Sequence, residues 1–302
     1  MCNVRHVVRR NAWSTLGLVW LCCATACIPG GLTDFSSISV GTFNAGTLRH
    51  GARLPAKGEG YVIPSLWASR EANYGTDEIV AMIRRAARRV TREYPGAQLG
   101  VGDLSLRGGR DSELHRSHRA GRDADLIFYA IDQQGRAVGP TNSMPRYGTD
   151  DRRARSPGPQ EHGVVFGPFS PRLLDVPRNW ALVRALLEDP YAEVQYLFCH
   201  EKIRQQLLAW ARSVGEDEAL VERAEALLRQ PSDSAVHDDH LHLRIHCAAD
   251  DRAYGCADRG PMRWWKQRYK YMPPGSPAGA LAELADLLMR AAQPVRLLGY
   301  VF

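Results

Sequence analysis

The sequence predicts an α+β fold, in which a small, mainly antiparallel sheet is flanked by helices. Three observations favour this class. Amphipathic helical patterns recur along the chain, short apolar runs with strand character lie between them, and one run, from 240 to 246, alternates strictly between aliphatic and polar residues, three of its four polar residues being histidine. With 302 residues and 44% hydrophobic content, the chain has ample material for the core of one large domain or two small ones.

The first long helix is predicted to begin at Thr76 and Asp77, which offer an N-cap. It is expected to stop at Pro95-Gly96. Arginines occupy one face of this helix, and the opposite face is apolar, with Ile79, Val80, Ile83, Ala87 and Val90. Residues 99–104 then suggest a short strand.

The later elements follow from the same periodicities. Helical patterns return at 180–187, 201–214 and 217–228, and the run 194–198 is predicted to be a strand. Residues 132–172 are polar and rich in Gly and Pro, and a loop of that length is usually functional or disordered. A last amphipathic helix begins near Ser276; we expect it to dock on the core, with a partner-binding or membrane-surface role as the alternative.

The first 26 residues have the character of an export signal. Arg5, Arg9 and Arg10 form a basic start, and residues 12–26 are uncharged and end in Ala24-Thr25-Ala26. The apolar stretch is too short to span a membrane. Removal of residues 1–26 takes away three arginines and no acidic residue, which lowers the formal net charge of the chain from +6 to +3. A charge that small does not indicate a nucleic-acid partner.

Cys27 follows these small residues, as a lipid-modified cysteine does at a bacterial lipoprotein signal. The same Ala-Thr-Ala also fits ordinary signal peptidase cleavage, so both alternatives stay open. Residues 30–51 are rich in Gly, Ser and Thr, as expected for a tether leaving a membrane. Cys247 and Cys256 are close enough to close a small disulfide loop in an oxidising compartment. Cys199 is either buried as a small hydrophobic residue or paired with a Cys27 that is not acylated.

Six of the ten histidines lie in two segments, at 112–125 and 237–247. In the second, Leu241, Leu243 and Ile245 alternate with histidines and an arginine. Side chains two apart on a strand share a face. We therefore expect the aliphatic residues to face a core, while His240 and His242 stand side by side on the other face.

In the first segment, His118 and Asp125 lie seven apart, with Gly121 between them and an apolar run at 126–129 after them. This pattern predicts a turn that leads into a strand, with Asp125 at its start. Two imidazoles and one carboxylate, with a fourth position open, form a frequent ligand set for catalytic zinc. The sequence therefore predicts a metal hydrolase site.

Other common chemistries lack their motifs. The chain contains no H-E-x-x-H, no G-x-S-x-G, no Walker loop and no pair of C-x-x-C motifs. A helix-borne zinc site, a serine nucleophile and a phosphate-binding loop are therefore not indicated.

The motif S-H-x-x-G-x-D-x-D, from Ser117 to Asp125, followed by H-D-D-H-L-H at 237–242, resembles the penicillin-insensitive murein endopeptidases. That family is grouped with lysostaphin-like enzymes, D-Ala-D-Ala peptidases and hedgehog domains. Shorter stretches support the resemblance: G-E-G-Y at 58–61, V-G-D-L-S at 101–105 and E-K-I-R-Q-Q-L at 201–207. It covers about residues 43 to 256. This chain has fewer cysteines than the family often has, and it has a C-terminal extension with paired tryptophans, so disulfide pairing and substrate preference stay open.

The resemblance implies a role for each of six residues. His118, Asp125 and His242 bind Zn²⁺, His240 lies beside the metal as a catalytic group, and His115 and His237 match two further active-site histidines. In some members the counterpart of His115 is associated with a second metal. Because no Glu adjoins the ligand histidines, His240 is the natural general base, and Asp238 or Asp239 would orient an imidazole.

We therefore expect an exported zinc peptidase that cuts peptide cross-links in bacterial peptidoglycan, of the D-alanyl–meso-diaminopimelyl type. A lipid anchor through Cys27 would hold it at the periplasmic face of the outer membrane; protein partners stay unknown. Two alternatives remain. A carboxypeptidase would use a basic residue such as Arg119 or Arg122 to hold a terminal carboxylate, and a non-catalytic peptidoglycan-binding lipoprotein would keep the metal for structure. The expected segments are a signal peptide at 1–26, a tether at 27–57, the peptidase domain at 58–256 and an extension at 257–302.

Overall fold

A computed structural model describes residues 36–109, 115–147, 172–232 and 234–259 of the chain. The signal peptide, Cys27, most of the 132–172 loop and the C-terminal helix with its tryptophans lie outside these residues. Within the described part, no helix combines the length and the apolar character that a membrane crossing requires.

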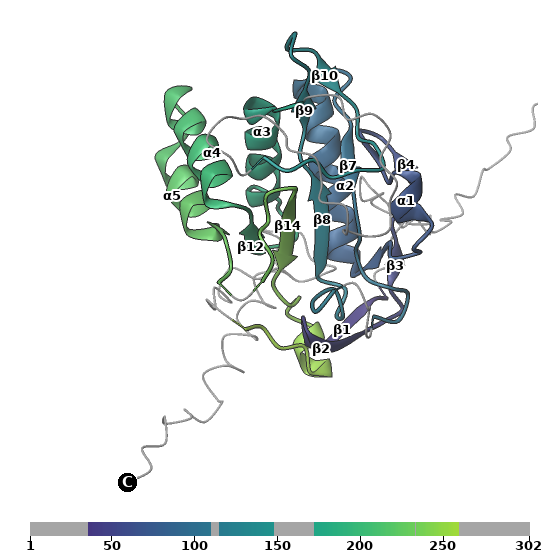
Figure 1. Ribbon diagram of the computed structural model, residues 1–302. Coiled ribbons are helices and arrows are strands. Elements are labelled where there is room, and N and C mark those ends of the chain that lie inside the picture. Colours follow the sequence, from purple (N-terminus) through teal and green to yellow (C-terminus); the bar gives the residue numbers. More distant parts are fainter. Residues whose placement is uncertain (1–35, 110–114, 148–171, 233, 260–302) are drawn as a thin grey trace, which may run out of the picture.

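The centre of the molecule is a seven-stranded mixed sheet with the order β13-β12-β14-β8-β7-β5-β4 (Figure 1). Two neighbouring pairs are parallel, β12 with β13 and β5 with β7, and the other four are antiparallel. This agrees with the predicted α+β class. The strands are Lys57–Gly58 (β4), Tyr61–Val62 (β5), Leu99–Val101 (β7), Asp123–Ile127 (β8), Val194–Phe198 (β12), Leu228–Arg229 (β13) and His240–Ile245 (β14).

Small sheets complete the fold at its edges. The hairpin of β1 and β2 lies at one end of the molecule, β3 pairs with β6, and β9 pairs with both β10 and β11 (Figure 1). Their bounds are Ile38–Thr42 (β1), Ala45–Arg49 (β2), Ala52–Arg53 (β3), Tyr74–Gly75 (β6), Ala130–Ile131 (β9), Ala137–Val138 (β10) and Leu173–Leu174 (β11).

The long helices pack on one side of the central sheet, with α2 behind β8 and β7 in the view of Figure 1, α5 against β12 and α4 against β13. The α2 helix begins after Thr76 as predicted, and its apolar face is buried in the core. Side chains cap three other helices: Asp175 accepts from the Arg178 N–H, His200 from Lys202 and Asp217 from Leu220. The helices are Ser65–Ala68 (α1), Asp77–Glu93 (α2), Val176–Leu187 (α3), Glu201–Ser213 (α4), Glu218–Leu227 (α5) and the 3₁₀-helix Asp251–Tyr254.

The structure differs from the expected segments at both ends. Residues 38–53 form strands rather than a tether, with Leu48 buried at 3% exposure and Leu54 fully buried. The hairpin also pairs with the rest of the domain: the Gly41 N–H donates to the Gly255 carbonyl, and the Leu48 N–H donates to that of Gly108. At the other end, Asp258 lies within the folded unit because it accepts hydrogen bonds from Arg122 and from the Cys247 N–H.

The cysteines behave as expected where the structure describes them. Cys247 and Cys256 form a disulfide with an S–S distance of 2.05 Å. Cys199 is buried and unpaired, and burial raises the pKa of its thiol to about 12. The Cys199 side chain is therefore a small hydrophobic group in the core.

Candidate metal centre

The site lies where β8 and β14 run side by side at the centre of the sheet. His242 is paired in register with Asp125, and Arg244 with Asp123. As the alternation predicted, Leu241, Leu243 and Ile245 are buried in the core. Asp125 lies in the middle of β8, not at its start, because strand pairing with β14 begins already at Asp123.

The turn before β8 brings His118 to the same place. His118 has a left-handed backbone with φ +64°, a conformation that costs free energy for a residue other than glycine and that often marks functional sites. Gly121, three residues later, has φ +74°, and a Cβ there would lie 2.6 Å from a Leu48 methyl carbon. The glycine of the motif is thus favoured by the left-handed backbone at this position and by the close approach of the Leu48 side chain from the β1–β2 hairpin.

Asp125 Oδ1 is the common point of three imidazoles. It lies 3.0 Å from His242 Nδ1, 3.3 Å from His118 Nε2 and 3.3 Å from His240 Nε2. Around a tetrahedral zinc with bonds of about 2.0–2.1 Å, neighbouring ligand atoms lie about 3.3–3.4 Å apart. The Asp125–His118 spacing therefore fits such an ion, and the Asp125–His242 spacing is somewhat shorter than the ideal.

The free lone pairs of this cluster point to a cation. His118 Nε2 and Asp125 Oδ1 are buried and have no hydrogen-bond partner. The opposite nitrogen of His118 bonds the Leu104 carbonyl at 2.9 Å, and that of His242 bonds Asp123 at 2.8 Å. Because those partners accept hydrogen bonds, each imidazole carries its proton on the nitrogen that faces away from Asp125. The nitrogen that faces Asp125 therefore presents a lone pair. Three inward lone pairs with no proton between them suit a metal ion.

Burial raises the pKa of the Asp125 carboxyl, but His118 and His240 outweigh it and hold the pKa well below its usual range. Asp125 is therefore ionised at neutral pH, as a metal ligand must be.

His240 is held by a carboxylate on its outer side. Its Nδ1 lies 2.6 Å from Asp239 Oδ1, so of the two candidates it is Asp239 that orients this ring. Asp238 is buried and lies 3.6 Å from Arg146 Nε instead. Burial lowers the pKa of His240, but Asp125 and Asp239 outweigh it and raise the pKa well above the usual value.

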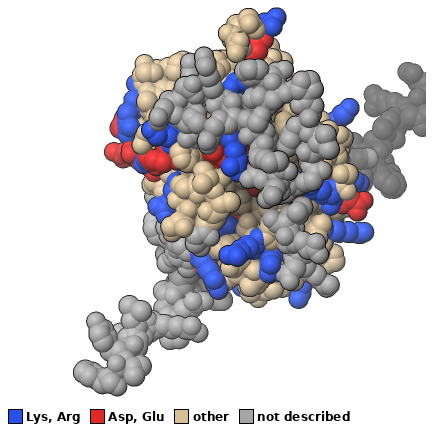
Figure 2. All heavy atoms as spheres, viewed as in Figure 1, with Lys and Arg blue, Asp and Glu red and all other residues tan. Residues whose placement is uncertain are grey.

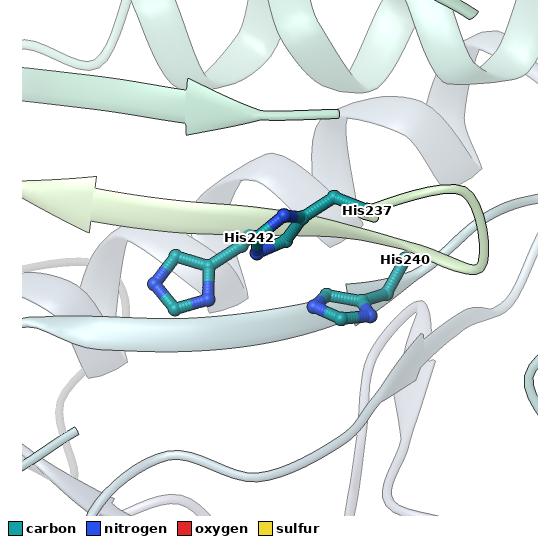
Figure 3. Close-up of side chains that lie close together, drawn as sticks. All are labelled: His237, His240 and His242. Atoms are coloured by element: carbon teal, nitrogen blue, oxygen red, sulfur yellow. The ribbon is translucent and has the colours of Figure 1, made fainter. Parts of the chain in front are cut away.

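His237 completes a group of three imidazoles. Figure 3 shows it on the segment that leads into β14, close to His240 and His242. Its ring centroid lies 5.2 Å from that of His240 and 5.5 Å from that of His242. Burial lowers the pKa of His237 to about 3, and the charges of the two other histidines add to this effect. His237 is therefore neutral at pH 7.

His115 lies at the edge of the cluster. Its ring centroid lies 4.4 Å from that of His118, with the two rings tilted, and together with Asp125 the two can offer ligand atoms within 4.8 Å of one another. The His115 Nε2 atom, however, bonds Asp103 at 2.9 Å and is 4.0 Å from Asp125. Asp103 in turn accepts from Arg70 at 2.7 Å.

Two residues of the site had no predicted role. Asp123 accepts hydrogen bonds from both His242 and Arg244, the latter at 2.7 Å. The Arg244 guanidinium stacks over the Phe43 ring, with 3.5 Å between its central carbon and the ring centroid. Burial raises the pKa of Asp123, but Arg244 and His242 outweigh it and hold the pKa far below its usual range. The sequence contained a signal for the role of Asp123, because this residue belongs to the same motif as Asp125 and shares its strand face.

All six histidine and aspartate residues singled out in the sequence thus converge on one region. Arg122, one of the two arginines considered for a carboxypeptidase, does not face this region. It is 1% exposed, and its guanidinium donates to Asp258, Ser39 and the Ile245 carbonyl. Arg122 is therefore committed inside the protein and is unavailable to a substrate carboxylate.

Comparison with known proteins points to one family. The family profile described as penicillin-insensitive murein endopeptidase matches residues 39–150, which include His118 and Asp125. A penicillin-insensitive murein endopeptidase of Pectobacterium atrosepticum is 26% identical over 219 residues, covering 70% of this chain and 66% of that protein. Two proteins of the same name, from Escherichia coli O1:K1 and strain SMS-3-5, are 26% identical over 248 residues, covering 81% of this chain and 75% of theirs. The chain is thus similar to the penicillin-insensitive murein endopeptidases, in sequence and in the residues of its site.

Proposed function

We propose that the protein is a zinc-dependent endopeptidase that cleaves peptide cross-links in bacterial peptidoglycan, of the D-alanyl–meso-diaminopimelyl type. The observation that carries the proposal is that His118 and His242 each turn a lone pair toward Asp125, at 3.3 and 3.0 Å, beside the His240 imidazole that the ligand set does not use. The name of the family profile and of the curated relatives supplies the substrate class.

His118, Asp125 and His242 would hold the zinc. When bound there, zinc would lower the pKa of a water molecule toward ~7 and polarise the scissile carbonyl. Asp123 and the Leu104 carbonyl keep the two ligand histidines in the tautomer that binds metal.

His240 is the proton carrier. Because Asp239 accepts its Nδ1–H, the Nε2 atom faces the ligands. The Asp125 charge that raises the pKa of His240 would be offset by a zinc ion on that carboxylate, and the neutral Nε2 would then take a proton from the attacking water and pass it to the leaving amine. Asp239 stabilises the imidazolium that forms in between. His237 is the second catalytic histidine of the proposal, neutral and beside both rings.

His115 differs from the three other proposed ligands because its Nε2 already has a partner, Asp103. A metal ion at His115 would have to replace that contact. The zinc of the main site needs no such exchange.

The location and the domain limits belong to the same proposal. Residues 1–26 direct export and Cys27 carries a lipid that anchors the chain at the periplasmic face of the outer membrane. The peptidase domain begins with β1 and ends after Asp258, since both ends are bonded into the fold. Replacing Cys27 by Ser should move the protein from the membrane fraction to the soluble periplasm; a mature N-terminus that mass spectrometry finds unmodified would indicate simple secretion.

The direct test is digestion of purified sacculi. The zinc-loaded protein should convert cross-linked muropeptides into monomers, a chelator should abolish this, and added zinc should restore it. Mass spectrometry of the products separates the alternatives: a carboxypeptidase would remove terminal D-alanine and leave cross-links intact. Sacculi that bind the protein and stay uncut in the presence of zinc would support the non-catalytic lipoprotein.

A further inference from the structure

One end of the site face carries unbalanced positive charge. From Ser36 to Arg53 every charged residue is basic, and the same holds for the described residues of 104–109 and 115–122. Figure 2 shows Lys and Arg side chains gathered on the lower part of this face, where Figure 1 places β1 and β2. Four of these side chains at the surface define what we call the basic rim: Arg49, Arg107, Arg116 and Arg119.

Three arginines of the basic rim have no carboxylate partner. Arg49, Arg107 and Arg116 are exposed, and across the described ranges no acidic oxygen lies within ion-pair distance of them. Arginines on the helices behave differently: Arg89 pairs with Glu188, and Arg212 with Glu225. Since a guanidinium stays charged at any physiological pH, the rim attracts anions.

Short contacts link the rim to the metal centre. Arg116 and Arg119 adjoin His115 and His118 in the chain, and the Arg119 N–H donates to the Phe43 carbonyl. The Phe43 ring carries the Arg244 guanidinium, which bonds Asp123 beside the ligand His242.

The Leu48 N–H donates to the Gly108 carbonyl, so the chain segments that carry Arg49 and Arg107 lie side by side. A polymer bound across the candidate metal centre would therefore meet the rim.

We propose that the basic rim binds free carboxylates of the peptidoglycan stem peptide whose cross-link occupies the metal centre. The inference rests on the proposed function. Stem peptides carry free carboxylates beside their cross-links, so an arginine rim can fix the strand that enters the site. Guanidinium groups suit this task because they bind carboxylates with two parallel hydrogen bonds. Arg107 and Arg116 are the specificity residues, since neither has an internal role that the substrate would have to displace.

The test compares two double variants that lose the same charge. Arg107→Gln/Arg116→Gln removes two rim charges, and Arg89→Gln/Arg92→Gln removes two from the α2 helix behind the sheet. Steady-state cleavage of a cross-linked muropeptide dimer is measured with the dimer as the free acid and after chemical amidation of its carboxyl groups. Zinc content is measured for both variants.

The rim variant should lower kcat/KM for the free-acid dimer by about three- to tenfold, mainly through KM, as expected for exposed charge pairs. It should keep its zinc, match the parent on the amidated dimer and show a weaker salt dependence. Equal losses in both double variants, or a loss that persists on the amidated dimer, would overturn the proposal.

A binding arm separates this proposal from the proposed function. Co-sedimentation of the chelator-treated protein with sacculi at low and high salt needs no catalysis. Suppose that the parent does not cut sacculi, although its binding to them depends on Arg107 and Arg116. The peptidase activity is then refuted, while the proposal for the basic rim stands. If the parent cuts sacculi and both variants bind and cut as it does, the rim is refuted alone.

Discussion

Two buried groups of histidine and carboxylate side chains lie at the two ends of β14. They differ in whether their polar atoms have hydrogen-bond partners within the protein. At the metal centre, His118 Nε2 and Asp125 Oδ1 have no hydrogen-bond partner. In the group after the strand, which we call the clamp, Asp258 accepts from Arg122, Arg252, His246 and the Cys247 N–H.

The clamp is a structural group because its charges are balanced from within the protein. Its carboxylate meets two guanidinium groups and closes the loop that the Cys247–Cys256 disulfide also closes. In the metal centre, by contrast, the lone pairs of the ligand atoms face one another. They repel one another unless a cation lies between them. A His–Asp pair in a sequence is thus ambiguous, and the atoms left without a partner decide its role.

The largest effect that distinguishes the two groups is on metal content. His242→Ala should reduce zinc from about one ion per chain to none and abolish cleavage, because it removes a ligand. His246→Ala removes an equally buried imidazole four residues later and should keep the zinc. Metal analysis of both purified variants is the measurement. Full zinc in His242→Ala would show that this residue is not a ligand.

The next effect separates catalyst from ligand within one strand. His240→Ala should keep its zinc but lose ~10²- to 10⁴-fold in turnover, as removal of a general acid-base group does. Asp239→Asn should lose less, since the imidazole remains and only its orientation is weakened. Zinc content and muropeptide release are measured together. Near-parental turnover in His240→Ala would move the search for the base to His237 and Asp239.

A smaller effect concerns the residue behind the ligand. Asp123→Asn should weaken zinc binding by ~10- to 100-fold, because the His242 tautomer is then no longer fixed by a carboxylate. Arg244→Gln should act in the same direction through the loss of its bond to Asp123. Competition with a chromophoric chelator gives the dissociation constants, and Asp132→Asn, at a half-buried carboxylate between β9 and β10, is the control. Unchanged affinity in Asp123→Asn would leave that carboxylate a purely structural role.

The limits of sequence inference can be seen in these same residues. Alternation along 240–246 was enough to predict which side chains face the core and that His240 and His242 are neighbours. It could not assign Asp123, because its partners are set by the register in which β14 pairs with β8. Nor could it choose between Asp238 and Asp239, since the path of the turn before β14 decides which carboxylate meets His240.

The β1–β2 hairpin was missed for a different reason. Its sequence is rich in Gly, Ser and Thr, so composition alone favoured a tether. The segment folds because its backbone groups pair within the hairpin and with Gly108 and Gly255, and because Leu48 fills the space over Gly121. Such pairing partners are remote in sequence and leave no local periodicity.

The smallest predicted effect lies in the clamp and concerns stability rather than metal. Burial raises the pKa of the Asp258 carboxyl, but His246 and Arg122 outweigh it and lower the pKa to about 2. Against an ordinary aspartate with a pKa near ~3.9, this difference corresponds to roughly 2.5 kcal/mol of stability at pH 7. Asp258→Asn should therefore lower the free energy of unfolding by about that amount or more, since Arg122 stays buried without its anion.

The pH dependence of that loss follows from the sign of the shift. Because the folded-state pKa is depressed, the contribution is fully present above ~pH 4 and disappears as the pH falls through about 2. The difference between the parent and Asp258→Asn in urea unfolding should thus be constant from pH 7 to pH 5 and shrink by about half near pH 3. The zinc content of Asp258→Asn should equal that of the parent while the protein is folded. A variant that lost zinc at pH 7 with its fold intact would show that the clamp and the metal centre are coupled, and the contrast between them would fail.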